Sequence, residues 1–115
     1  MVECPIDLSV FNELKEATGS DFIKELVETF MEEAPGILVD LKGAITSGDE
    51  DQFRRSAHSL KSNANVFGAH ELAELARQME ISGLGSDQEV ANQKAIALEA
   101  VYDLSTGKLK DLIDG

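Results

Sequence analysis

One histidine in this chain stands among cations in a segment with helical character. His58 is the second residue of the run from Ala57 to Gly68, and no Asp or Glu occurs between residues 52 and 70. The whole chain carries 22 acidic residues among 115, so this stretch is locally unusual. Three of the ten Lys and Arg residues lie within four positions of the histidine: Arg54, Arg55 and Lys61. A partner that brings negative charge would be attracted here.

An accessible imidazole is a nucleophile toward phosphorus. A free imidazole titrates near about 6.5, so much of it is neutral at cytosolic pH and can carry a phosphoryl group as a phosphoramidate. On a helix, Lys61, Ser62 and Asn65 share the face of His58, because they follow it by three, four and seven positions. Lys61 could neutralise phosphoryl charge, and Ser62 or Asn65 could donate hydrogen bonds or contact a partner. Arg54 and Arg55 would extend this docking face.

Other uses of the histidine stay open at this point. A catalytic triad needs an acid beside His58, which only a distant part of the chain could supply. His58 and His70 are poorly spaced for a metal, and neither ends a Glu-x-x-His motif, because Arg55 and Phe67 stand three positions before them. No haem-binding motif occurs. A surface histidine without a role is the simplest alternative, and His70 is expected to be exposed or to cap a helix.

Composition indicates one helical domain over residues 1–115, with residues 1–6 as a frayed tail. The net charge of −12 argues against binding to nucleic acid or to an anionic membrane. The single cysteine, Cys4, excludes an internal disulfide, and no signal peptide or membrane-spanning run occurs. We therefore expect a reduced, cytoplasmic and monomeric protein.

Helix signals divide the chain into five helices. The expected caps are Asp7, Ser20, Asp49 and either Ser86 or Asp87, and the expected ends are Gly19, Ser47-Gly48, Gly68 and Ser82-Gly83. Asp49 with Gln52 resembles a capping box. Apolar spacing keeps its phase across Pro35, so we expect a kink there and not a domain boundary.

Apolar residues recur at helical spacing, and no segment alternates as a strand would. The second helix has a stripe from Ile23 to Ile45, and the third has a seam of Phe53, Ala57, Leu60, Ala64 and Phe67. The stripe expected in the last helix comprises Val90, Ala97, Leu98, Val101, Leu104, Leu109 and Leu112. These patterns predict an all-α fold, an antiparallel up-down four-helix bundle with the short first helix packed on one end.

The run Ala57-His58-Ser59-Leu60-Lys61, followed by small residues, Val66-Phe67 and Gly68-Ala69, resembles the signature of the histidine phosphotransfer (HPt) domain family of two-component phosphorelays. The lead-in Ser47-Gly48-Asp49 and the run Asp51-Gln52-Phe53-Arg54 also look like that family, and residues 72–80 fit its next helix, so the resemblance covers roughly residues 20 to 85. It implies that His58 accepts a phosphoryl group from a receiver-domain phosphoaspartate and passes it to another response regulator. It also implies that Lys61 stabilises the phosphoryl charge and that Gly68 is structural.

The resemblance further implies a phosphocarrier with no ATP site and no cofactor of its own, because magnesium would sit on the partner receiver. Many family members have Gly directly after the lysine, whereas Ser62 stands here and could alter partner choice. Two alternatives remain. One is the phosphotransfer domain of a larger hybrid or chemotaxis-type histidine kinase, although the start at Met1 favours a standalone protein. The other is a helical module that binds receivers without accepting phosphate. A hybrid histidine kinase is a further candidate partner.

Overall fold

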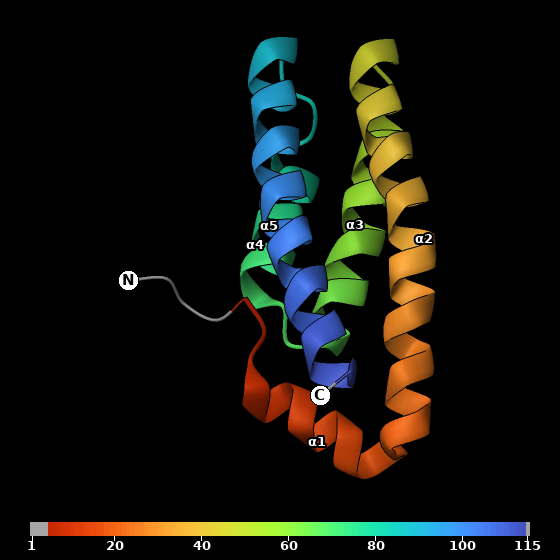
Figure 1. The fold of residues 1–115 in the computed structure, drawn as a ribbon. Helices are drawn as coiled ribbons and strands as arrows, with labels where there is room; N and C mark the ends of the chain where they lie inside the picture. Colours follow the sequence, from red (N-terminus) through yellow and green to blue (C-terminus); the bar gives the residue numbers. More distant parts are fainter. Residues whose placement is uncertain (1–4, 115) are drawn as a thin grey trace.

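The computed structural model describes residues 5–114 and consists of five helices joined by short turns. These are α1 (Leu8–Thr18), α2 (Ser20–Ser47), α3 (Glu50–Val66), α4 (His70–Ser82) and α5 (Gln88–Asp114). Figure 1 shows α2 to α5 side by side as a bundle, with α1 lying across one end. The predicted antiparallel four-helix bundle with an extra N-terminal helix is confirmed. Residues 5–114 contain no strand.

Most predicted helix boundaries agree with the structure, and two cap details differ. Asp7 caps α1 by accepting hydrogen bonds from the backbone N–H groups of Ser9 and Val10. Asp49 caps α3 through the N–H of Gln52, but the Gln52 side chain donates to the Ser56 hydroxyl and not back to Asp49, so only half of a capping box forms. The expected cap at Ser20 is wrong, because α2 already begins at that residue.

The remaining boundaries follow the sequence signals. Asp87, rather than Ser86, accepts hydrogen bonds from the N–H groups of Glu89 and Val90 at the start of α5. α2 continues through Pro35 as one helix, so the proline is not a domain boundary. Gly48 and Gly68, which follow α2 and α3, both have a positive φ, as a residue just beyond a helix end often has.

The core is formed by the apolar faces of all five helices. Every residue of the predicted seam of α3 is buried, and the stripe of α2 is buried or half-buried along its length. Phe30 of α2 packs against Phe67 and Tyr102, with ring centroids 5.5 and 5.9 Å apart. These aromatic contacts join α2, the residue that follows α3, and α5.

The predicted stripe of α5 is partly wrong. Val90 and Leu104 are exposed, and Ala97 also faces solvent. The buried face of α5 is instead formed by Ala91, Ala95, Leu98, Tyr102, Ser105 and Leu109. Ser105 tolerates burial because its hydroxyl donates to the carbonyl of Val101. The helix therefore packs through small side chains, which a search for large apolar residues does not detect.

Two residues of the predicted frayed tail at residues 1–6, namely Pro5 and Ile6, are among the described residues. Ile6 is only 1% exposed and belongs to the core. Cys4 and the rest of the first four residues lie outside the described residues. Within residues 5–114 no helix is both long and apolar enough to cross a membrane. The same residues contain no group of three His, Cys, Asp or Glu side chains placed to hold a metal ion.

Candidate functional site

The third helix, α3, presents His58 to solvent, whereas the residues of its inner face are buried. Ala57 and Leu60 are fully buried against the neighbouring helices, and α3 packs on both α2 and α4. Because successive helical residues are about 100° apart, fixing Ala57 in the core turns His58 outward. The side chain of His58 is 58% exposed. A partner can therefore reach its imidazole without unfolding any part of the bundle.

A carboxylate from the next helix joins the two residues that the sequence put forward. Glu80, in the last turns of α4, lies with Oε2 2.8 Å from Nδ1 of His58. Its other oxygen, Oε1, accepts a hydrogen bond of 2.8 Å from Nζ of Lys61. The side chain of Glu80 thus holds both His58 and Lys61 in position. The side chains of Lys61 and Glu80 are 24% and 27% exposed, so this bridge lies at the edge of the bundle surface.

The charge of Glu80 determines which ring nitrogen of His58 is free. The hydrogen bond from Lys61 is the largest cause that lowers the pKa of Glu80, and the hydrogen bond from His58 adds to it. Glu80 is therefore ionised at neutral pH, and an ionised carboxylate only accepts hydrogen bonds. Nδ1 must then carry the proton of a neutral imidazole. The lone pair is left on Nε2, the ring nitrogen farther from the backbone, where it can act as a nucleophile.

The arginines near the site are less available than the sequence suggested. Arg54 donates to Glu50 through Nε and Nη2, and Arg55 pairs with Asp51 at 3.0 Å. These acids lie just outside the acid-free stretch. The predicted docking face therefore consists of cations that are each matched by a carboxylate. These two arginines therefore give the docking face no net positive charge.

Ser62 and Asn65 are exposed on the face of α3, as the helical spacing predicted. Within residues 5–114 neither side chain makes a hydrogen bond to another protein group. Both are therefore open to a partner that approaches the helix. Their predicted roles in hydrogen bonding or docking remain predictions.

Gly68 is held at the turn between α3 and α4 by a close approach of the N-terminal segment. Its carbonyl accepts a 2.8 Å hydrogen bond from the N–H of Asp7. Its φ is +76°, and a Cβ at this position would lie 2.8 Å from the Cβ of Val10. The space and the backbone conformation therefore both require glycine, which supports the structural role expected for Gly68. The carboxylate of Asp7 also forms a hydrogen bond with Nε2 of His70, the first residue of α4.

Glu80 is the site residue that sequence reasoning missed. It belongs to the helix after His58 and is 22 residues away, so no local spacing connects the two. One signal was present. In an antiparallel helical hairpin, residues equally far from the turn meet across the interface, and His58 and Glu80 are equally far along the chain from Ala69.

Comparisons with known proteins show which family the chain is similar to. The family model described as Hpt domain matches residues 25–114. The sensor protein TorS of Escherichia coli (strain K12) is 31% identical over 97 residues, which are 83% of this chain. The chain spans only 11% of the length of that relative. The residues matched by the family model, 25–114, include the whole helical hairpin that carries His58, Lys61 and Glu80.

A solved structure has the same fold. The crystal structure of histidine-containing phosphotransfer protein B (HptB) from Pseudomonas aeruginosa PAO1 superposes with a TM-score of 0.72. The similarity covers 98% of this chain and 94% of that chain, at 24% sequence identity. The likeness of fold thus extends over nearly the whole of both chains.

Proposed function

We propose, because the chain belongs to the Hpt domain family of histidine phosphotransfer domains, that Nε2 of His58 is its phosphoryl acceptor. The function of the chain is histidine phosphotransfer in a two-component phosphorelay. The donor in this proposal is the phosphoaspartate of a receiver domain, and the next acceptor is the aspartate of another response regulator. The observation that carries the assignment is the Glu80 bridge, which leaves Nε2 as the exposed nucleophile.

The proposed step is an in-line displacement at phosphorus. The Nε2 lone pair forms the N–P bond, the bond from phosphorus to the aspartyl oxygen breaks, and the carboxylate of the receiver leaves with that electron pair. The ring becomes positively charged as the bond forms. Glu80, beside the proton on Nδ1, stabilises that charge. The same step in reverse, toward a second aspartate, returns the imidazole to its starting state.

Lys61 supplies positive charge to the phosphoryl group in this proposal. Its ammonium group has three N–H donors and gives one of them to Glu80, so donors remain for phosphoryl oxygens. The receiver would contribute magnesium and its acidic pocket, because the carrier has no need to activate the phosphoryl group itself. We therefore propose a phosphocarrier and not a turnover enzyme. It would act as a monomer in the cytoplasm.

A second arrangement of the same function is favoured by one observation. The relative TorS is a sensor protein of which this chain spans 11%. The chain could thus be the phosphotransfer domain of a larger kinase, and a hybrid histidine kinase would then be its direct donor. A module that binds receivers without accepting phosphate is a different function. It would not need a free Nε2.

The test is transfer from a panel of labelled, phosphorylated receiver domains to the full chain, with binding measured in parallel. We expect label that is stable in alkali and labile in acid, as a phosphoramidate is, and we expect none on His58→Gln despite retained receiver binding. Binding without label on the wild-type chain would refute the proposal and favour the non-transferring module.

A further inference from the structure

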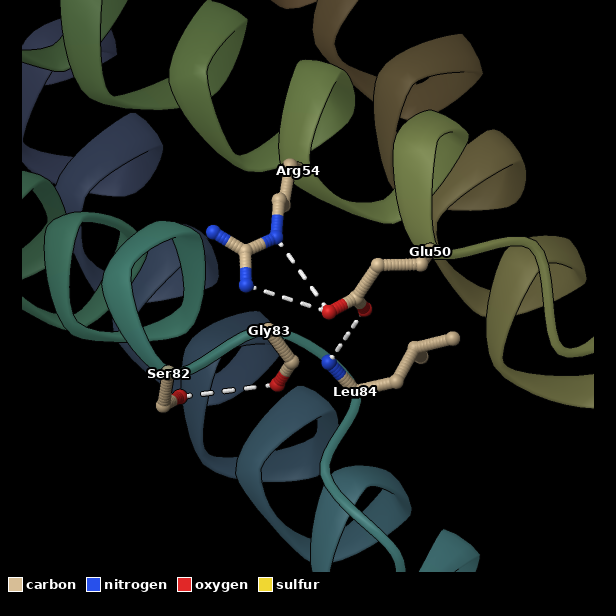
Figure 2. Close-up of polar contacts among 5 residues, drawn as sticks. All are labelled: Glu50, Arg54, Ser82, Gly83 and Leu84. Atoms are coloured by element: carbon tan, nitrogen blue, oxygen red, sulfur yellow. Dashed lines mark hydrogen bonds and ion pairs between the residues drawn. The ribbon is translucent and has the colours of Figure 1, made fainter.

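A second carboxylate ties α3 to the connection that follows α4. Glu50, in the first turn of α3, accepts a 2.7 Å hydrogen bond from the backbone N–H of Leu84 in the α4–α5 connection. Its other oxygen accepts hydrogen bonds of 3.2 and 3.1 Å from Nε and Nη2 of Arg54. Figure 2 shows the carboxylate lying between the arginine and the connection. The hydrogen bond from Leu84 is the largest cause that lowers the pKa of Glu50.

Gly83 makes room for this contact. Its φ is +67°, a conformation that side chains disfavour, and it caps α4 by donating its N–H to the carbonyl of Met79. A Cβ added at this position would collide with the carboxylate of Glu50 and would lie 2.7 Å from Nη2 of Arg54. The close approach of Glu50 to the connection therefore depends on glycine at residue 83.

The tie lies directly beyond Glu80. Gly83 follows Glu80 by three positions, so the Glu50 contact holds the end of the helical turn that carries the site carboxylate. Two short hydrogen bonds depend on where that turn lies against α3, namely those from His58 and Lys61 to Glu80. The Leu84 side chain packs against the core and resists sliding of the connection. Glu80 thus reaches from α4 to α3, and Glu50 reaches from α3 to the connection that follows α4.

We infer that Glu50, together with Gly83, is a positioning residue that sets the place of Glu80 and through it the free nitrogen of His58. This inference rests on the proposed function, because it concerns the same acceptor nitrogen. Glu50 touches neither His58 nor the phosphoryl group in this account. It acts by fixing the last turn of α4 against α3. Loss of the tie lets Glu80 move away from the ring, and the proton then shifts from Nδ1 toward Nε2.

Asp51 provides a matched control for Glu50. It lies one residue along the same first turn, carries the same charge and pairs with Arg55 at i+4, as Glu50 pairs with Arg54. Within residues 5–114 its side chain makes no hydrogen bond or ion pair with the α4–α5 connection. Glu50→Ala and Asp51→Ala therefore each remove one negative charge and the acidic partner of one arginine, but only Glu50→Ala breaks the tie. Glu50→Gln is the conservative variant, because its amide oxygen still accepts from Leu84.

The readout is the tautomer of each imidazole, measured through nitrogen-15 chemical shifts in the unphosphorylated full chain. We expect Glu50→Ala to shift His58 toward the Nε2–H tautomer and to slow phosphoryl acceptance severalfold. Asp51→Ala should leave both unchanged, and Glu50→Gln should restore most of the wild-type tautomer. His70 serves as an internal reference, since Glu50 does not position it.

A His58 tautomer that is the same in Glu50→Ala and Asp51→Ala would overturn the inference. If Glu50→Ala loses its helical signal in circular dichroism, Gly83→Ala decides the question, because it disturbs the tie while every carboxylate remains. It should produce the same tautomer shift, and an unchanged ring would again overturn the inference. A wild-type chain that accepts no phosphoryl group would refute the proposed function but would leave this tautomer comparison intact.

Discussion

His58 and His70 are the two histidines of the chain, and each pairs with one carboxylate across a gap in the sequence. Their side chains are 58% and 63% exposed, and the distances to their carboxylates are 2.8 and 2.9 Å. The difference lies in the ring nitrogen that is used. His58 contacts Glu80 through Nδ1, whereas His70 contacts Asp7 through Nε2. The outer nitrogen is therefore free in the first residue and occupied in the second.

The two carboxylates also do different work. Glu80 accepts from a lysine, so a cation stands beside His58. Asp7 instead accepts hydrogen bonds from two backbone N–H groups and caps α1, so its negative charge stabilises the N-terminus of that helix. Exposure and an acidic partner are thus insufficient to identify a phosphoryl acceptor. The free nitrogen and the adjacent cation separate the reactive histidine from the one that holds α1 against the bundle.

The largest expected effect separates the two histidines directly. His58→Gln should abolish phosphoryl acceptance, because it removes the nucleophile, and its exposed position should leave the helical fold intact. His70→Gln should accept phosphoryl groups at the wild-type rate. Transfer from a phosphorylated receiver, with circular dichroism as the fold control, measures both. Loss of acceptance in His70→Gln alone would reverse our assignment of the two residues.

A smaller effect is expected from the cation that only His58 has. Lys61→Ala should slow transfer by about tenfold, because it removes positive charge beside the phosphoryl oxygens. Lys42→Ala is the matched control, since Lys42 also lies 2.8 Å from a glutamate, Glu99, and joins α2 to α5. Rapid-quench transfer kinetics on both variants would measure the difference. Equal rates for the two variants would remove Lys61 from the account.

The smallest effect concerns stability in acid. The pKa of Glu80 is lowered below its usual 4.5, chiefly by Lys61, so the charged form is favoured in the folded state. The resulting stability is present above the unfolded pKa and is lost as the pH falls through the folded pKa. Glu80→Gln should therefore be less stable than the wild type at pH 7, and the difference should shrink below pH 4.5.

Urea unfolding at a series of pH values would measure this convergence. Many other carboxylates titrate in the same range, so the informative quantity is the difference between wild type and variant at each pH. A difference that stays constant from neutral to acidic pH would show that the ionised form of Glu80 contributes nothing specific.

The sequence predicted the fold well where large apolar side chains set the helical phase. The stripes of α2 and α3 contain Phe and Leu at regular spacing, and their buried faces match the prediction. The predicted phase of α5 is wrong because its buried face includes the small residues Ala91, Ala95 and Ser105, while the large Leu104 is exposed. Small residues allow close helix packing, but their burial leaves a weak signal in the sequence.

The site was predictable only as far as it lies on one helix. His58 and Lys61 share a face of α3, and their spacing of three residues was enough to predict this. Glu80 and Glu50 belong to the site through contacts of α3 with α4 and with the connection after it, and these contacts depend on the register of α3 against α4. That register is set by core packing and by the turn at Gly68, not by any local motif. The stretch around His58 contains no acid, so the sequence gives no local sign that Glu80 of the next helix contacts the histidine.

The most direct test of the central claim is to locate the phosphoryl group on the ring. The full chain, labelled with nitrogen-15 in its histidines, would be phosphorylated by a receiver domain and examined for phosphorus–nitrogen coupling by NMR. Our account predicts a single coupling, to Nε2 of His58, with the resonances of His70 unchanged. Coupling to Nδ1 of His58, or to either nitrogen of His70, would contradict it.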